Sequence, residues 1–111
     1  MRAEADLLQS VPTKLYIGGE WVDAEGGKTL TVSDPATGAH LATIADASEA
    51  DAQKAMDAAA AVQEEWGNSS PRVRGEILRK AWELLIERRD DFALLMTIEM
   101  GKPFAEAQGE V

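Results

Sequence analysis

The sequence divides into two parts whose hydrophobic patterns differ. Residues 14–45 carry strand signals, namely short branched or aromatic segments separated by glycine and proline turns. Residues 49–111 carry helix signals, with apolar residues recurring at three- and four-residue steps. The division predicts an antiparallel β segment followed by helices, and it leaves residues 1–13 as an N-terminal tail.

The β segment is predicted to begin with a hairpin. In KLYIGGEWVD (residues 14–23), Gly18 and Gly19 accept the positive φ angles that a two-residue turn requires. Aromatic and branched residues flank the two glycines, as is typical of paired strands. A second turn is predicted at residues 25–27, where two more glycines follow a glutamate.

The segment TLTVSDP is predicted to be the third strand. Pro35 ends it, because proline has no N–H to donate to a sheet ladder. Residues 34–38 form a turn in which proline presets φ and glycine follows where the chain bends. A last strand is expected to return from this turn over residues 40–45.

Four helices are predicted, over residues 49–66, 71–88, 91–100 and 103–111. Ser48 caps the first helix, and Asp51 three residues later completes a variant of the capping box. Pro71, preceded by a capping serine, suits the first position of the second helix. Asp90 or Asp91 is expected to cap the third helix. Glycine follows the first and third helices, at Gly67-Asn68 and at Gly101.

The first two helices carry wide apolar faces. These faces consist of Ala52, Ala55, Met56, Ala59, Val62 and Trp66 in the first helix, and of Val73, Ile77, Leu78, Ala81, Leu84 and Leu85 in the second. Most charged residues of the second helix fall outside its face. The faces are wide for helices that pack only on each other, and the local rules do not say what covers them.

Composition excludes several functions. Twenty acidic residues against 11 basic ones give a net charge of −9, which disfavours nucleic acid and anionic lipid as partners. The absence of cysteine removes disulfides, thiolate metal sites and a cysteine nucleophile. The single histidine, His40, begins a strand and is expected to be exposed. No signal peptide or membrane segment is evident, so a cytoplasmic protein is expected. The chain alone offers no catalytic residues.

Three stretches, in this order, resemble the N-terminal part of the aldehyde dehydrogenase superfamily. They are IGGEWVDAEGGKTLTVSDPATG, WGNSSPRVRGEILRKAWELLIERRDDFALLMTIEMGKP and MTIEMGKPFAEAQGEV. The first is similar to the opening strands of the family, with Asp34 where the family more often has asparagine. The last is most similar to the succinate-semialdehyde dehydrogenase group. The resemblance covers about residues 14–111.

Members of this family are several times longer than this chain. The resemblance implies that residues 14–111 are the N-terminal part of an incomplete NAD(P)-binding domain, an α/β fold whose Rossmann-type central strands come later. The nucleophile, the activating glutamate and the dinucleotide loop would then lie beyond Val111. The fragment alone is expected to be inactive and to bind no cofactor.

The implied activity of the parent protein is oxidation of a small aldehyde. Succinate semialdehyde would become succinate through a cysteine thiohemiacetal and hydride transfer to NAD or NADP. The implied partners are the aldehyde and the rest of the dehydrogenase chain, and the intact protein is expected to be a homo-oligomer. Neither nucleic acid nor a membrane is an expected partner.

The resemblance also implies one site within this chain. Many family members hold a structural monovalent cation with a backbone carbonyl just before the Asn-Pro turn and the acid of a Glu-x-Gly-Lys-Pro motif. These positions match Val32 and Glu99. Carbonyl and carboxylate oxygens suit a hard cation. The alternative is that Glu99 merely lies in the last turn of a helix.

Two alternative interpretations stay open at this point. The chain could be a non-catalytic helical module that binds a protein partner through exposed apolar faces. It could also be an independent α+β domain whose resemblance is only local. A sharp cooperative melt of a monomer would favour the independent domain, whereas exposed hydrophobic surface and association would favour the fragment.

Overall fold

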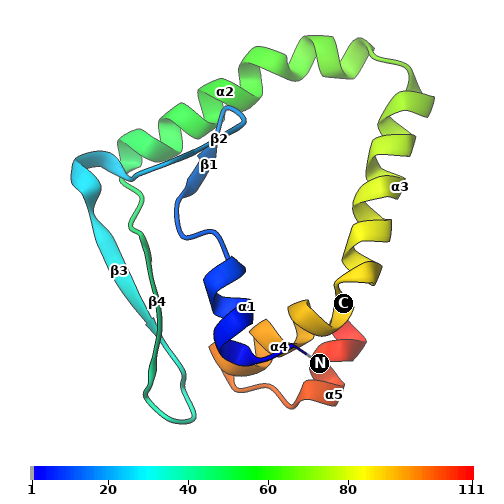
Figure 1. The fold of residues 1–111 in the computed structure, drawn as a ribbon. Helices are drawn as coiled ribbons and strands as arrows, with labels where there is room; N and C mark the ends of the chain where they lie inside the picture. The colour runs from blue at the N-terminus through cyan, green and yellow to red at the C-terminus, as the bar shows by residue number, and fades with distance from the viewer. Residues whose placement is uncertain (1) are drawn as a thin grey trace.

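The computed structural model describes residues 2–111, which form two antiparallel β ribbons and a series of helices (Figure 1). The strands are β1 (Leu15–Ile17), β2 (Glu20–Val22), β3 (Thr29–Ser33) and β4 (His40–Ala45), with a short 3-10 helix η1 at Glu25–Gly27. The α-helices are α1 (Glu4–Ser10), α2 (Glu49–Asn68), α3 (Pro71–Glu87), α4 (Arg89–Met100) and α5 (Phe104–Glu110). The predicted order of a β segment followed by four helices is confirmed.

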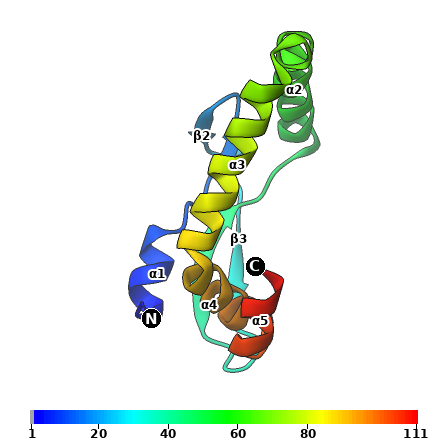
Figure 2. The ribbon, with the colours of Figure 1, turned by 90° about the vertical axis from the view of Figure 1, so that its right-hand side faces the viewer.

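The elements form a flat, open frame. In Figure 1, α2 lies along the top, α3 descends on one side, β3 and β4 form the other side, and α1, α4 and α5 gather at the base. The view turned by 90° shows how thin the frame is (Figure 2). Its extents are 47 × 37 × 19 Å and its radius of gyration is 16.9 Å, against about 13 Å for a compact domain of about 100 residues.

The hydrophobic core is a small cluster at the base of the frame. Leu7 of α1 packs with Leu94 and Ile98 of α4, and partly buried residues surround them: Leu8, Leu41, Leu95 and Phe104. Helix α1 therefore has a structural role within residues 1–13, which the sequence analysis described only as a tail. It has seven residues and no side-chain cap, so local sequence signals for it are weak, and packing of Leu7 accounts for its position.

The predicted hairpin is confirmed as the ribbon of β1 and β2. Gly18 and Gly19 have φ angles of 61° and 86°, as a two-residue hairpin turn requires. The rings of Tyr16 and Trp21 contact each other across the strands, with centroids 4.9 Å apart and planes inclined at 49°. A Cβ atom on Gly18 would lie 4.0 Å from that of Ala58 in α2, so small residues allow the hairpin to approach this helix.

The second ribbon, β3 with β4, contains a β-bulge. Val32 pairs with Ala42 and Ser33 pairs with His40, so Leu41 has no opposite residue. Such an extra residue disrupts the ladder locally and bends the strand. Leu41 consequently lies on the same side as Ala42, and both contact the interior at the base of the frame.

The predicted capping box at the start of α2 is confirmed and extends to a second loop. Asp51 is 3% exposed. Its carboxylate accepts hydrogen bonds from the N–H of Glu25, at 2.9 Å, and from the N–H and hydroxyl of Ser48, at 3.0 and 3.1 Å. The bond from Glu25, followed by those from Ser48, lowers the pKa of Asp51. This carboxylate therefore connects the loop after β2 to the first turn of α2.

Predicted helix boundaries are wrong at the end of α2 and at the start of α4, and Ser70, predicted to cap α3, makes no side-chain capping bond. Gly67 stays helical and α2 continues to Asn68, because the first extended residue is Ser69, with ψ at 156°. Helix α4 begins at Arg89, so Asp90 and Asp91 lie in its first turn and neither caps it. The preceding residue has φ −104° and ψ 17°, so the chain passes from α3 to α4 without the extended residue that a capping side chain needs.

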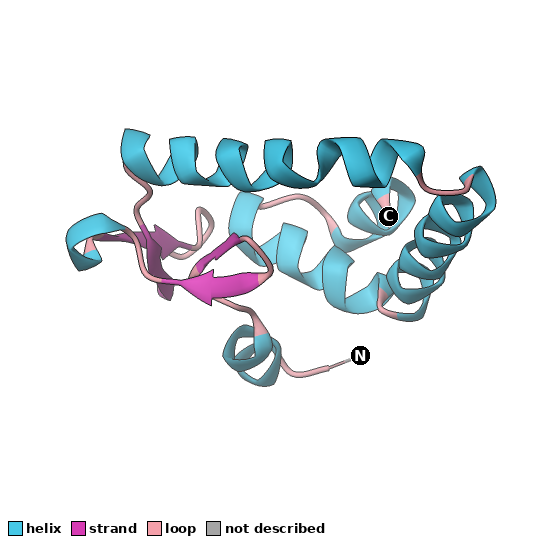
Figure 3. Cartoon of the chain, turned by 90° about the horizontal axis from the view of Figure 1, so that it is seen from above, coloured by secondary structure: helices cyan, strands magenta, loops and turns pink. Residues whose placement is uncertain are grey.

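The predicted apolar faces of α2 and α3 are exposed in this chain. No residue of α3 is buried, and Leu78 and Trp82 expose 67% and 59% of their surface. The only buried residue of α2 is the polar Asp51. The view from above shows α2 along one edge of the frame with α3 at its far end (Figure 3). Within residues 2–111, no helix is both long and apolar enough to cross a membrane.

Substitutions in the core cluster and on α3 should have very different effects. Ile98→Ala removes a buried side chain and should lower the free energy of unfolding by about 2–5 kcal/mol. Leu78→Ala alters a side chain that contacts mainly solvent and should change it by less than about 0.5 kcal/mol. Urea titrations followed by circular dichroism measure both, and equal losses would contradict the assigned core.

Candidate functional site

Val32 and Glu99, which the family resemblance singles out, line the same pocket. Val32 lies in β3 and Glu99 in the last turn of α4. The pocket has a volume of about 130 Å³ and lies between α1, the β3–β4 ribbon and α4. Its other lining residues are Leu8, Val11, Thr13, Leu41, Ala42, Ile44 and Leu95. The fold thus brings together two residues that are far apart in the sequence.

Close contact between two turns accounts for this arrangement. Gly101 ends α4 in the left-handed conformation, with φ 78°, and its N–H bonds to the carbonyl of Thr97 at 2.9 Å. A Cβ atom at Gly101 would lie 3.5 Å from Cγ of Pro35. The predicted glycine cap is confirmed, and it allows the end of α4 to lie against the turn that follows β3.

The turn after β3 is held by Asp34. Its carboxylate accepts hydrogen bonds from the N–H of Ala36 at 2.7 Å and from the hydroxyl of Thr37 at 2.8 Å. The bond from Ala36 and then that from Thr37 lower the pKa of Asp34. Its carbonyl accepts from the N–H of Gly38 at 2.8 Å. These bonds fix the turn immediately beyond Val32.

The polar groups at the pocket limit its chemistry. Thr13 and Glu99 supply its polar side chains, and the other side chains are aliphatic. The interruption of the β ladder begins at Val32, which also lines this pocket. A water molecule requires about 10–15 Å³ of such a volume, so an ion with several waters fits. Oxygen donors of this kind suit a hard cation, and residues 2–111 contain no group of three or more His, Cys, Asp or Glu that could hold a metal.

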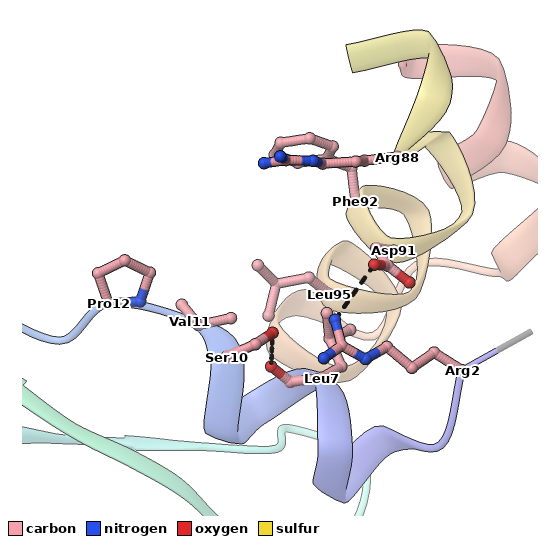
Figure 4. A pocket seen from close by; sticks show the side chains of 9 residues that line it. All are labelled: Arg2, Leu7, Ser10, Val11, Pro12, Arg88, Asp91, Phe92 and Leu95. Carbon is pink, nitrogen blue, oxygen red and sulfur yellow. Dashed lines mark hydrogen bonds and ion pairs between the residues drawn. The ribbon is translucent and has the colours of Figure 1, made fainter. Parts of the chain in front are cut away.

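A larger pocket, of about 470 Å³, lies where α1 meets α4 (Figure 4). Arg2 and Asp91 form an ion pair across it at 3.4 Å, and the hydroxyl of Ser10 donates to the carbonyl of Leu7 at 2.7 Å. Sequence reasoning missed this pocket, because one of its walls comes from residues 2–12, which were predicted to be only a tail. The labelled side chains include no nucleophile paired with a base.

His40 lies outside both pockets, as the first residue of β4. It is exposed, as predicted, and its Nε2 lies 3.0 Å from the hydroxyl of Thr43. A catalytic triad would need an acid and a nucleophile around this imidazole. The Thr43 hydroxyl lies beside the imidazole, but no carboxylate of residues 2–111 bonds to His40 to orient it.

Residues 21–111 match the sequence profile of the aldehyde dehydrogenase family. The match covers most of the chain and includes both turns that adjoin the candidate site. This chain belongs to the aldehyde dehydrogenase family.

Individual relatives are consistent with this assignment. A glutarate-semialdehyde dehydrogenase of Pseudomonas putida is 44% identical over 86% of this chain and 20% of the relative. A succinate-semialdehyde dehydrogenase of Paenarthrobacter nicotinovorans is 59% identical over 64% of this chain and 16% of the relative. The betaine aldehyde dehydrogenase of Staphylococcus aureus, solved in complex with NAD+, superposes with a TM-score of 0.91 at 28% identity, over 96% of this chain and 22% of that one.

These comparisons also show how much of a known enzyme the chain covers. It spans 20% of the length of the Pseudomonas relative and 22% of the solved Staphylococcus chain. Its strands and helices therefore correspond to one part of each known enzyme.

Asp34→Asn should alter the acid stability of the chain. The pKa of Asp34 in the fold lies below the unfolded value of about 3.9. Ionised Asp34 therefore stabilises the fold above that pH, and the stabilisation is lost as the pH falls through the folded-state pKa. Asparagine keeps an acceptor for the N–H of Ala36 and does not titrate.

The difference in free energy of unfolding between the parent chain and Asp34→Asn should thus shrink on acidification. Urea midpoints measured from neutral pH to below pH about 3.9, the unfolded pKa, give this difference. Asp46→Asn, which removes an exposed carboxylate without side-chain hydrogen bonds among residues 2–111, controls for the loss of one negative charge. A difference that stays constant with pH would contradict the assigned role of Asp34.

Proposed function

We propose that residues 14–111 are the N-terminal part of the NAD(P)-binding domain of an aldehyde dehydrogenase. The observation that carries this proposal is the exposure of the apolar faces of α2 and α3 in a chain that spans 20% of the Pseudomonas relative. Helices in folded domains bury such faces. The later part of the protein would supply a Rossmann-type parallel sheet to cover them.

The reaction that we propose for the whole protein is oxidation of succinate semialdehyde to succinate. A cysteine thiolate outside this chain would add to the aldehyde carbonyl and form a thiohemiacetal. NAD or NADP, when bound, accepts the hydride, and water then releases the acid. The 59% identity to a succinate-semialdehyde dehydrogenase over 71 residues supports this substrate, and the 44% identity to a glutarate-semialdehyde dehydrogenase over 96 residues makes glutarate semialdehyde the competing candidate. A non-catalytic helical module is not favoured by the family match.

The cofactor would be held outside this chain. A dinucleotide-binding loop places glycines between a strand and the N-terminus of the following helix. Within residues 2–111, the glycines with positive φ lie in turns within the β segment or, for Gly101, at the end of α4. This arrangement does not fit a dinucleotide, so the residues of this chain enter no step that involves the cofactor.

The activity test compares this chain with the protein produced from its whole gene. The 111-residue chain should form no NADH or NADPH above background. The whole protein should oxidise succinate semialdehyde with the highest kcat/KM. Glutarate semialdehyde has one more methylene, which a binding pocket distinguishes by about 10–200-fold.

Absorbance of the reduced cofactor measures these rates, with betaine aldehyde as a third substrate and each cofactor tested in turn. Aldehyde oxidation by the 111-residue chain alone would contradict the assignment of catalysis to the rest of the protein. A higher kcat/KM for glutarate or betaine aldehyde would retain the family and replace the substrate.

We also propose that the pocket at Val32 and Glu99 holds a structural monovalent cation. The Glu99 carboxylate, the Val32 carbonyl and the Thr13 hydroxyl are the oxygen donors that this chain would contribute. Because most other lining side chains are aliphatic, water and further backbone carbonyls would complete the coordination. The cation would then join the end of α4 to the end of β3.

Glu99→Gln should abolish a specific effect of potassium or sodium on stability. At a salt concentration about ten times Kd, one bound ion stabilises the fold by about 1.4 kcal/mol. The unfolding midpoint of the parent should therefore be higher in potassium or sodium chloride than in tetramethylammonium chloride of equal ionic strength. Glu106→Gln, at an exposed position of α5, serves as the matched control. An equal response in the parent and Glu99→Gln would exclude the site.

A further inference from the structure

A guanidinium group lies at the corner between α2 and α3. Nη1 of Arg74 is 3.2 Å from the carbonyl oxygen of Gly67 and 3.5 Å from that of Trp66, and it also bonds to the carbonyl oxygen of Ser69. Nη1 carries two hydrogens, so the carbonyls of Ser69 and Gly67 are its principal acceptors. Every other residue of α3 is exposed, whereas Arg74 is half-buried.

The C-terminus of α2 lacks a cation of its own. Its last turn contains no basic residue, and Glu64 and Glu65 lie close to this end. Negative charge is unfavourable there, because the last carbonyls form the negative end of the helix dipole. Ser69 donates through its N–H and its hydroxyl, but both bonds go to the carbonyl of Trp66. Arg74 is the positively charged group that reaches the carbonyl of Gly67 in this last turn and that of Ser69 just beyond it.

The sequence at the start of α3 is unfavourable for α3 itself. Its first turn contains no acid, and Ser70 makes no side-chain capping bond. Arg72 and Arg74 instead place positive charge near the positive end of this helix dipole. The position of Arg74 thus disfavours its own helix slightly and stabilises the end of the helix before it.

We propose that Arg74 is a positioning residue that fixes the angle between α2 and α3. No buried side chain from either helix lies at this corner, so packing does not determine the angle. The hydrogen bonds from Arg74 hold the last turn of α2 against the start of α3. The two exposed apolar faces are thereby presented in one arrangement to the rest of the domain. That the two faces dock onto the rest of the domain rests on the proposed function. The hydrogen bonds of Arg74 do not depend on it.

The angle can be measured as a distance between two spin labels. The chain has no cysteine, so Ala52→Cys in α2 and Glu87→Cys in α3 give two unique labelling sites near the far ends of the helices. Electron–electron double resonance should show a narrow distance distribution in the labelled parent chain. Arg74→Gln should broaden it. Arg72→Gln, which removes a neighbouring exposed charge, should leave it narrow.

Circular dichroism shows whether the helices persist in each variant. If Arg74→Gln loses helicity, Arg74→Lys is compared with the parent chain instead. Lysine keeps the charge but lacks the planar guanidinium with its several N–H donors. We expect Arg74→Lys to give a broader distribution than the parent. A broad distribution in the parent, or a distribution that stays narrow in the helical Arg74 variants, would overturn the proposal.

The result is separable from the test of the proposed function, because the distances are measured on this chain alone. Broadening in Arg74→Gln together with a whole protein that oxidises no aldehyde would refute the enzyme and retain the role of Arg74. Active whole protein together with unchanged distances would retain the enzyme and refute the role of Arg74.

Discussion

The packing of Leu7 against Leu94 and Ile98 is the interaction on which the rest of this chain depends. It joins α1 to α4, and the β3–β4 ribbon and α5 pack around it through Leu41 and Phe104. Burying one large aliphatic side chain contributes about 1.5–3 kcal/mol, whereas ordering each residue costs about 1–2 kcal/mol of backbone entropy. A cluster of this size cannot also fix the positions of two long helices that bury almost nothing.

Directional polar contacts position those helices instead. Asp51 connects the start of α2 to the loop after β2, and Arg74 connects its end to α3. Their charges are opposite, and each matches the helix end that it contacts. Hydrogen bonds require defined distances and angles, so these two residues at the ends of α2 can set the shape of the frame while its apolar face stays available.

The features that the sequence predicted correctly are those that local rules determine. The hairpin at Gly18, the capping box at Ser48 and the cap at Gly101 each depend on residues a few positions apart. The missed features depend on partners in other elements: α1 is held by α4, and Arg74 of α3 bonds to a carbonyl of the preceding helix. Val32 and Glu99 came from family resemblance alone, because no spacing rule relates a strand carbonyl to an acid in a later helix.

The bulge at Leu41 has a consequence for how the β3–β4 ribbon can change during evolution. Side chains along a strand alternate between two faces, so an inserted or deleted residue normally exchanges the faces of everything beyond it. The unpaired Leu41 is one such extra residue, and the bulge accommodates it without exchanging the faces of the residues that follow. Loss of the extra residue at this position would therefore leave Ala42 and Ile44 in their present orientation, and length variation among homologues should concentrate there and in the adjacent turn.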